Sequence, residues 1–170
     1  MTLFYRPANF TEKEADNMKK RVFIVADYFI DKNNKEKVGL TNKKLQKLLY
    51  YAQAWSLVVN NKKLFEDDIE AWIHGPAISS VYSVFKKFGF ENIVASVDNQ
   101  EFSSLSSEER KILDTVWEVY GKKDANYLEL LTHNEDPWIK TRNSIPEYES
   151  SRKVIPPALM KEYYGRQIQE

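Results

Sequence analysis

The amino-acid sequence predicts a mainly α fold, a compact single-domain bundle of about six helices around a central buried helix at about residues 41–59, with at most a minor two-stranded β element. Apolar residues recur at helical spacing along most of the chain, which is the main signal for helices. Two Ser/Thr-x-x-Glu capping boxes mark helix starts. Five glycines in 170 residues are too few for a flexible linker, so a second domain is not expected.

The first two helices are expected in the N-terminal third of the chain. Residues 11–14 form a capping box that opens a helix over about residues 12–31. Thr41 is a suitable N-cap for the second helix, which runs to about Val59. Apolar residues cover almost the whole circumference of this second helix, and such a helix is buried on all sides. We therefore expect it at the centre of the domain.

The middle of the chain carries weak strand signals on either side of a helix. Residues 69–73 alternate between apolar and polar, and residues 93–97 are a second strand candidate. Gly75 and Pro76 fit the start of a helix, and Gly89 fits its end. A strand, a helix and a strand in this order predict a small parallel ribbon.

The C-terminal part is expected to hold three helices. A capping box at residues 106–109 opens the first, which ends at Gly121 in a left-handed conformation. Asp124 caps the second, which has to end before Pro137. A polar, irregular stretch follows, and the third helix is short and ends near Gly165.

The overall charge is balanced, with 25 Lys and Arg residues against 25 Asp and Glu residues. A protein without net positive charge lacks the field that attracts nucleic acids, so a nucleic-acid partner is not expected. The longest apolar runs are far shorter than the roughly 20 residues that span a bilayer. The N-terminus also lacks the pattern of a signal peptide. We therefore expect a cytoplasmic protein with no membrane partner.

The residue types argue against an enzyme. The chain has no cysteine, which excludes a thiol nucleophile and a zinc–thiolate site. His74 and His133 are the only histidines, and their spacing fits no compact metal motif. The sequence contains no serine-hydrolase elbow and no glycine-rich phosphate loop. We expect no catalytic residues, no metal and no cofactor.

Both histidines have a structural interpretation. His74 precedes the expected helix start at Gly75, where the positive end of the helix dipole favours a neutral imidazole that is hydrogen-bonded within the fold. A contact with a partner is the alternative for His74. His133 lies at a helix end, where its charged form would cap the terminal carbonyl groups.

Three lysines crowd the start of the central helix. Lys43, Lys44 and Lys47 lie where exposed cations oppose the helix dipole at a cost of about 0.3–1 kcal/mol each. Either nearby carboxylates such as Asp67 and Asp68 compensate for them, or an acidic partner or a phosphate does. The sequence leaves both alternatives open.

Aromatic residues are the strongest sign of binding. The chain has 4 Trp, 10 Tyr and 9 Phe residues, and Trp and Tyr are the side chains that anchor protein interfaces. Most of them belong to the expected core because they follow helical spacing. Ile24 and Tyr28 instead lie behind the apolar face of the first helix, where either the N-terminal arm covers them or they form a docking patch.

Three blocks of the sequence resemble the Panacea-domain family. They run from Leu40 to Trp55, from Leu64 to Pro76 and from Leu131 to Trp138, in the order found in that family. In this sequence the motif positions are Gln46, Gln53, Glu70, His74, Gly75, Pro76, His133, Asp136, Pro137 and Trp138.

The resemblance implies a bacterial or phage antitoxin that neutralises a cognate protein toxin by direct stoichiometric binding. A small alarmone synthetase is one example of such a toxin. Two alternatives remain open. One is a proteolytic adaptor that delivers a toxin to a ClpXP-type protease, as a SocA-type relative does. The other is a phage-borne protein that interferes with a host defence toxin.

A toxin-binding surface needs aromatic anchors and charges that steer association. The candidates for partner binding are Tyr28, Lys43, Lys44, Lys47, Tyr50, Trp55, Trp72 and Tyr82. The two tryptophans have an alternative place in the core.

The whole chain, residues 1–170, is expected to form one Panacea-like domain. Its motif-bearing core spans about residues 20–142. An N-terminal arm at residues 1–11 precedes the core, and a C-terminal tail at residues 144–170 follows it.

Overall fold

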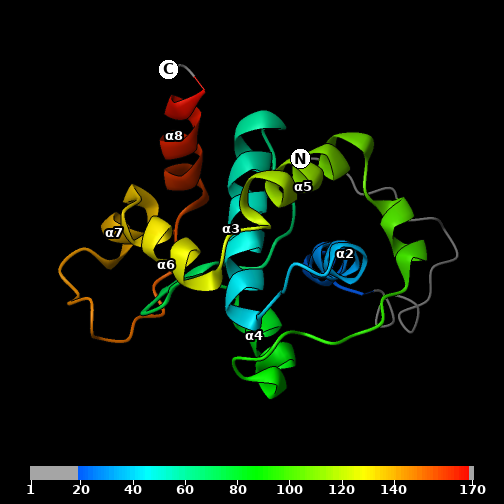
Figure 1. Cartoon of the computed structure of the whole chain (residues 1–170). Helices are drawn as coiled ribbons and strands as arrows, with labels where there is room; N and C mark the ends of the chain where they lie inside the picture. Colours follow the sequence, from blue (N-terminus) through cyan, green and yellow to red (C-terminus); the bar gives the residue numbers. More distant parts are fainter. Residues whose placement is uncertain (1–18, 169–170) are drawn as a thin grey trace, which may run out of the picture.

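Helix α3 (Asn42–Val59) is the centre of the molecule in the computed structural model, which describes residues 19–168. All but four of its 18 residues are buried, as the all-round apolar pattern predicts. Neighbouring helices surround it on several sides (Figure 1). They are α2 (Arg21–Glu36), α4 (Ser79–Phe85), α5 (Ser107–Tyr120), α6 (Ala125–His133) and α8 (Pro157–Gln167). The predicted mainly α fold around a central helix is confirmed.

Side-chain caps start three of these helices as predicted. Thr41 accepts a hydrogen bond from the Lys44 backbone at 3.2 Å at the start of α3. Ser106 and Glu109 form a reciprocal capping box at the start of α5. Asp124 accepts from the Tyr127 backbone at 2.7 Å and caps α6. Each cap satisfies backbone amides that lack a partner within the helix.

Gly121 ends α5, but not in the predicted left-handed conformation. Its φ is −61°, within the right-handed helical region. A side chain at this position would place its Cβ 2.4 Å from the Trp117 carbonyl oxygen and 2.7 Å from the Trp117 ring. Glycine is therefore required here by the close packing against Trp117 and not by a positive φ.

Three helices differ from the expectation. Helix α2 begins at Arg21 and extends to Glu36, whereas the expected helix ran over about residues 12–31, and the capping box at residues 11–14 lies outside the described residues. Pro137 does more than end α6, because it occupies the first turn of an unpredicted helix, α7 (Asp136–Arg142). Proline suits this position because its missing N–H would have no helical acceptor there. Helix α8 continues through Gly165.

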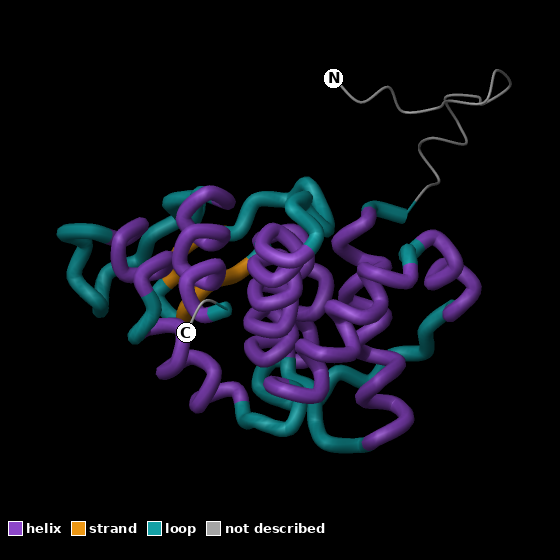
Figure 2. The backbone as a smooth tube through the Cα atoms, turned by 90° about the horizontal axis from the view of Figure 1, so that it is seen from above, coloured by secondary structure: helices purple, strands orange, loops and turns teal. Residues whose placement is uncertain are grey.

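The β element is an antiparallel hairpin, and the predicted parallel ribbon is wrong. Strands β1 (Glu70–Trp72) and β2 (Gly75–Ala77) pair so that Ala71 lies opposite Pro76. Gly75, with a φ of +92°, lies at the turn, so the chain reverses where a helix was expected. Residues 93–97 form no strand, and the hairpin is the strand structure in the described part of the chain (Figure 2).

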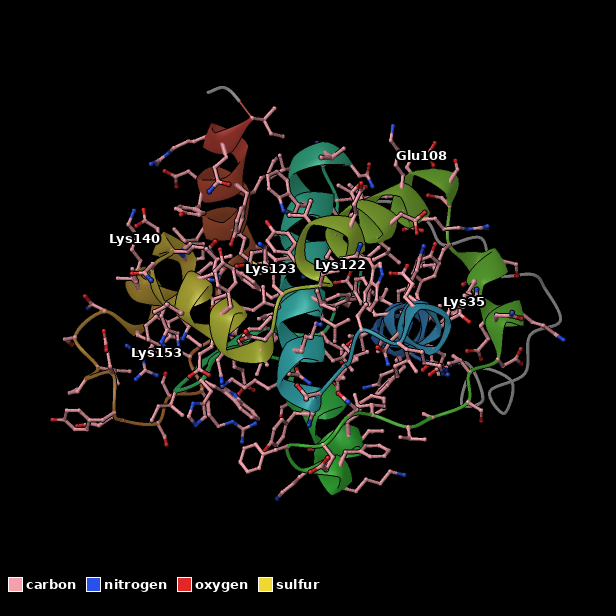
Figure 3. All side chains as sticks on the ribbon, in the orientation of Figure 1. Lys35, Glu108, Lys122, Lys123, Lys140 and Lys153 are labelled. Carbon is pink, nitrogen blue, oxygen red and sulfur yellow. The ribbon has the colours of Figure 1, made fainter. Side chains whose placement is uncertain are left out.

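The C-terminal tail is part of the core. Met160 and Tyr164 of α8 are buried against α3, and α8 lies alongside α3 in Figure 1. The loop between α7 and α8 pairs with the hairpin through backbone hydrogen bonds, including one of 2.7 Å from Ile155 N to Ile69 O. Lys140 on α7 and Lys153 on this loop point outward at the periphery (Figure 3). No helix within residues 19–168 has the length and apolar composition to cross a membrane.

Candidate functional site

Seven of the predicted site residues gather around the first two turns of α3. There the helix, the β1–β2 hairpin and the segment formed by α4 and the 3-10 helix η1 (Lys86–Phe88) enclose a cleft of about 190 Å³, which we call the α3–hairpin cleft. Helix α4 lies beside the start of α3 in Figure 1. The predicted residues on its walls are Lys43, Gln46, Lys47, Trp72, His74, Gly75 and Tyr82.

Three distant parts of the sequence meet around Gly75. A Cβ atom on this residue would lie 2.7 Å from Lys47 Cε and 2.8 Å from Thr132 Oγ1. Lys47 comes from α3, Gly75 from the hairpin and Thr132 from the end of α6. Glycine is therefore required here twice, for its positive φ and for the close approach of the other two segments.

Lys47 is at the back of the cleft and is not a surface charge, in contrast to its predicted role as a steering residue. Only 2% of it is exposed, and its ammonium group donates a hydrogen bond to the Pro76 carbonyl at 3.1 Å. Burial lowers the pKa of Lys47 to about 7, and nearby Glu129 opposes this shift. Burial disfavours the charged form of any amine, because the ammonium loses its hydration.

Glu129 of α6 supplies the compensation that the sequence analysis sought in Asp67 and Asp68. It forms an ion pair with Lys43 and a hydrogen bond with His74 Nδ1 at 2.9 Å. Burial favours a raised pKa for Glu129, but the hydrogen bonds from Lys43 and His74 outweigh it and the pKa is lowered. The carboxylate is therefore ionised and holds α3, α6 and the hairpin turn together.

His74 and Lys43 thus differ from their predicted settings. His74 lies in the exposed hairpin turn and not at a helix start, because β2 occupies residues 75–77 and the expected helix begins only at Ser79, as α4. Lys43 is half-buried and also donates to Asn126 Oδ1 at 2.9 Å. Asp67 accepts instead from the Ser80 hydroxyl at 3.1 Å.

The motif glutamines connect α3 to the segments that follow it. Gln46 accepts from the Ile78 backbone at 2.8 Å and donates to Asn42 Oδ1 at 3.0 Å. Gln53 accepts from the Leu64 backbone and donates to the Phe65 carbonyl, both at 2.8 Å. Buried amides with both ends satisfied fix the register of neighbouring segments. These two residues are structural, and Gln46 also borders the cleft.

The aromatic wall of the cleft comes from Trp72 and Tyr82, whose rings meet edge to face at 4.9 Å. Trp72 donates through Nε1 to Glu70, which also accepts from Arg152 Nε at 3.0 Å. Phe90 stands at the rim and is 97% exposed. Phe90 is not among the residues that the sequence predicts for the site. The available signal was a large apolar residue directly after Gly89, at the end of a helix.

The third motif block, residues 131–138, packs against the hairpin. Trp138 donates through Nε1 to the Trp72 carbonyl at 2.8 Å, and the His133 ring stacks on it at 3.9 Å. Burial lowers the pKa of His133, so the predicted charged cap is wrong. Its Nε2 has no hydrogen-bond partner among the described residues. Asp136 opens α7 and pairs with Lys140 at 2.8 Å.

The remaining predicted contacts lie elsewhere. Tyr50 is fully buried and bonds to the Tyr164 hydroxyl at 3.1 Å, so it cannot anchor a partner on the folded domain. Lys44 is buried and donates to the Gly39 carbonyl at 2.8 Å. Neither residue offers a surface to a toxin.

Tyr28 and Trp55 are half-buried but distant from the cleft. Tyr28 packs on Phe102 of the 3-10 helix η2 (Asn99–Ser104) and donates to Asp114 at 2.8 Å. Its neighbours in the structure therefore come from η2 and α5, whereas the N-terminal arm lies outside the described residues. Trp55 lines a largely apolar groove of about 450 Å³ between the end of α3 and α5, which begins near Glu108 (Figure 3).

The described residues offer no cluster of three or more His, Asp or Glu side chains that could hold a metal ion. The cleft instead combines a buried lysine, Lys47, with an aromatic wall, and the Glu129 carboxylate pairs with Lys43 of the same cleft.

The convergence of three separated sequence blocks around Gly75 agrees with a comparison to protein families. The family described as "Antitoxin SocA-like, Panacea domain" matches residues 45–139, which is more than half of the chain. The chain belongs to this family. No curated protein and no solved structure gives a significant match.

The matched Panacea domain begins inside α3 and ends inside α7, so it contains the hairpin, α4, α5 and α6. Helices α2 and α8 lie outside the match, although both pack on α3. Membership in the family supports an antitoxin role.

Proposed function

We propose that this Panacea-domain protein neutralises a cognate protein toxin by direct stoichiometric binding, and that the toxin contacts the α3–hairpin cleft and the exposed residues around it. The observation that supports this assignment most strongly is the meeting of the three motif blocks at Gly75, in the wall of an open cleft.

The residues around the cleft have the composition of a binding surface. Interfaces combine a few aromatic anchors with a polar, solvent-exposed rim. Trp72, Tyr82 and Phe90 provide aromatic surface, while Lys86 and His74 provide the polar rim. A standard interface buries roughly 1,600 Å² in total, so a toxin would extend beyond the cleft.

Helix α6 extends this surface. Asn126 and Glu129 connect α6 to the cleft through Lys43. Tyr127 and Leu130 are exposed on α6, and residues three apart lie on neighbouring positions of one helix face. Exposed apolar side chains beside a cleft are typical of protein-binding sites.

Binding without turnover fits the described side chains. Lys47 has a strongly shifted pKa, but its ammonium group is bound to a backbone carbonyl and the cleft walls carry no serine or cysteine nucleophile beside it. Stoichiometric inhibition requires only a complementary surface and a slow dissociation rate.

The decisive experiment is a growth-rescue assay. The product of the gene adjacent to the one encoding this chain is expressed in a host, with and without this protein. We expect the neighbour alone to arrest growth, the pair to grow, and the two proteins to copurify in fixed stoichiometry. A harmless neighbour, or rescue without a complex, contradicts direct neutralisation of a linked toxin.

The binding surface is tested by matched exposed substitutions. Phe90→Ser removes the exposed ring at the cleft, and Tyr148→Ser removes a similarly exposed ring on the loop between α7 and α8. We expect Phe90→Ser to weaken the complex at least tenfold and Tyr148→Ser to leave it unchanged, because only the first is at the proposed face. Equal behaviour of the two variants places the interface elsewhere.

A host that lacks the ClpXP protease distinguishes direct binding of the toxin from delivery of the toxin to that protease. Direct neutralisation predicts that rescue persists, with unchanged toxin levels, in a host that lacks the ClpXP protease. Rescue that disappears in that host favours the adaptor mechanism. A phage-borne protein that counters a host toxin would instead rescue growth from a toxin that is encoded away from its own gene.

A further inference from the structure

We infer that the α3–hairpin cleft is the receptor for an acidic side chain of the bound partner, an Asp or Glu that lies next to an apolar residue and bonds to Lys47. This inference deepens the proposed function and rests on it. It follows from the size, the charge and the walls of the cleft.

The size of the cleft selects a side chain over a small-molecule ligand. Pockets for drug-sized ligands and cofactors typically measure about 300–1,000 Å³. The α3–hairpin cleft measures about 190 Å³. It is therefore suited to one inserted side chain.

The charge of the cleft selects an acid. Lysine has three N–H donors, and Lys47 uses one of them, on the Pro76 carbonyl, within the described residues. Lys43 and Lys86 add two more cations to the walls. Glu129 is the neighbouring carboxylate, and it is already paired with Lys43 and His74. Burial disfavours the ammonium form of Lys47, so an incoming carboxylate would stabilise that form and accept a charge-assisted hydrogen bond from it.

The walls select an apolar neighbour for that acid. The Trp72 and Tyr82 rings form one side of the cleft, and Phe90 is exposed at its rim. An apolar residue beside the acidic one would cover Phe90 while the carboxylate reaches inward. This arrangement excludes water around the ion pair, which strengthens it.

Two matched peptides test the inference on the full-length chain labelled with ¹⁵N. The probes are acetyl-Phe-Glu-amide and acetyl-Phe-Gln-amide, which differ only in the carboxylate. The C-terminal amide replaces the terminal carboxylate, which could otherwise bind to Lys47 in place of the side-chain carboxylate. We expect the Glu peptide to bind at least tenfold more tightly and to shift the backbone amide signals of Gly75, Ala77 and Lys86.

Three variants locate the effect. Lys47→Met is expected to abolish the preference for the Glu peptide. Lys86→Met removes an exposed cation whose side chain makes no hydrogen bond or ion pair within residues 19–168, and is expected to weaken binding of the Glu peptide two- to threefold. Lys122→Met, an exposed lysine in the connection between α5 and α6, is the control and is expected to change nothing. Lys86→Met keeps the test valid if Lys47→Met fails to fold.

Several results overturn the inference. Equal affinity for both peptides means that the cleft recognises only apolar groups. Binding of inorganic phosphate in place of either peptide means that the cleft is an anion site of another kind. Absence of binding by both peptides at millimolar concentration also overturns it.

The growth assay separates this inference from the proposed function. Toxin rescue that is retained by Lys47→Met and Lys86→Met, with equal affinity for both peptides, overturns the acid receptor while leaving neutralisation intact. Loss of rescue by the unmodified chain overturns neutralisation, whatever the peptides do.

Discussion

Gly75 joins three segments at the scale of a single residue. Its φ of +92° disfavours any side chain, and a Cβ would be within 2.8 Å of both Lys47 and Thr132. Gly89 also has a positive φ, +56°, but a Cβ there would meet nothing within 4 Å. A comparison of substitutions at the two glycines therefore distinguishes the cost of backbone strain from the cost of steric crowding.

We expect Gly75→Ala to lower the free energy of unfolding by about 3 kcal/mol or more, because it adds a steric clash to the strain of a positive φ. Gly89→Ala carries the strain alone and is expected to cost about 1 kcal/mol. Urea denaturation of both variants measures the difference. Equal losses would show that Lys47 and Thr132 move aside at little cost.

Glu135 is a buried carboxyl group held by tyrosines. It accepts hydrogen bonds from Tyr164 at 2.6 Å and from Tyr51 at 3.2 Å. Burial raises the pKa of Glu135 to about 7, and these hydrogen bonds only partly oppose the shift. The cluster joins the start of α7 to α3 and α8.

Glu135 makes stability depend on pH. Because folding raises its pKa from 4.5 to about 7, its contribution is complete below pH 4.5 and is lost as the pH rises through 7, by about 3 kcal/mol in total. We expect Glu135→Gln to gain stability relative to the unmodified chain between pH 5 and about 8. Urea denaturation across this range measures the difference.

Glu129 provides the control of opposite sign. Its pKa is lowered in the fold, so its contribution is present above its ordinary pKa and is lost as the pH falls. Glu129→Gln is therefore expected to lose stability relative to the unmodified chain at neutral pH and to approach it in acid. A pH-independent difference for both variants would contradict the two assignments.

At the scale of elements, α7 connects the hairpin to the loop between α7 and α8. Arg142 at the end of α7 is buried and donates to three backbone carbonyls, those of Ala71 at 3.1 Å, Pro146 at 2.7 Å and Glu149 at 2.5 Å. Its guanidinium also lies 4.9 Å from the Trp138 ring. One side chain thus organises a loop without regular secondary structure.

We expect Arg142→Met to lower the free energy of unfolding by about 2–4 kcal/mol, because buried carbonyl groups lose their donors. Arg142→Lys keeps the charge but cannot reach three acceptors, so it is expected to recover only part of the loss. Hydrogen exchange is expected to accelerate first in the loop at residues 143–155. Uniform acceleration over the whole chain would show that Arg142 has no local role.

At the scale of the whole molecule, α3 is the helix on which most of the others pack. It contacts α2, α4, α5, α6 and α8, whereas α7 packs on α6, α8 and β1, and the buried apolar residues of these elements form one cluster. Figure 2 shows the described helices gathered around it. Helices outside the matched family region are therefore as integral to the core as those inside it.

We expect a single unfolding transition. Far-ultraviolet circular dichroism reports the helices, and tryptophan fluorescence reports Trp55 and Trp117 near α3 and Trp72 and Trp138 near the hairpin. The two signals are expected to coincide in urea, because each helix loses its packing surface when α3 unfolds. Separate midpoints would show that the hairpin and α7 form a second cooperative unit.

Local chemistry explains which elements the sequence predicts well. Thr41, Ser106 and Asp124 each cap a helix by accepting from a backbone amide only three residues away, so the signal is complete within a short segment. The all-round apolar pattern of α3 also predicts directly that every side of this helix is buried. The family resemblance follows from the same three sequence blocks and is confirmed by the matched region.

Long-range contacts explain the errors. Whether Gly75 and Pro76 start a helix or turn a strand depends on β1, and the apolar pattern of five residues does not distinguish them. The charge partner of Lys43 is Glu129, which lies 86 positions away in the sequence. Phe90 is exposed because no other element within residues 19–168 covers the end of η1, although phenylalanine is a residue type that is usually buried.

The sequence by itself thus determined the helical fold, the central place of α3, the family and the residue types of the site. Only the tertiary structure decided which of those residues share the α3–hairpin cleft, which are buried, and which stand exposed. The physical reason is that capping and periodicity act within a few residues, whereas burial and charge pairing depend on segments that folding brings together from distant parts of the chain.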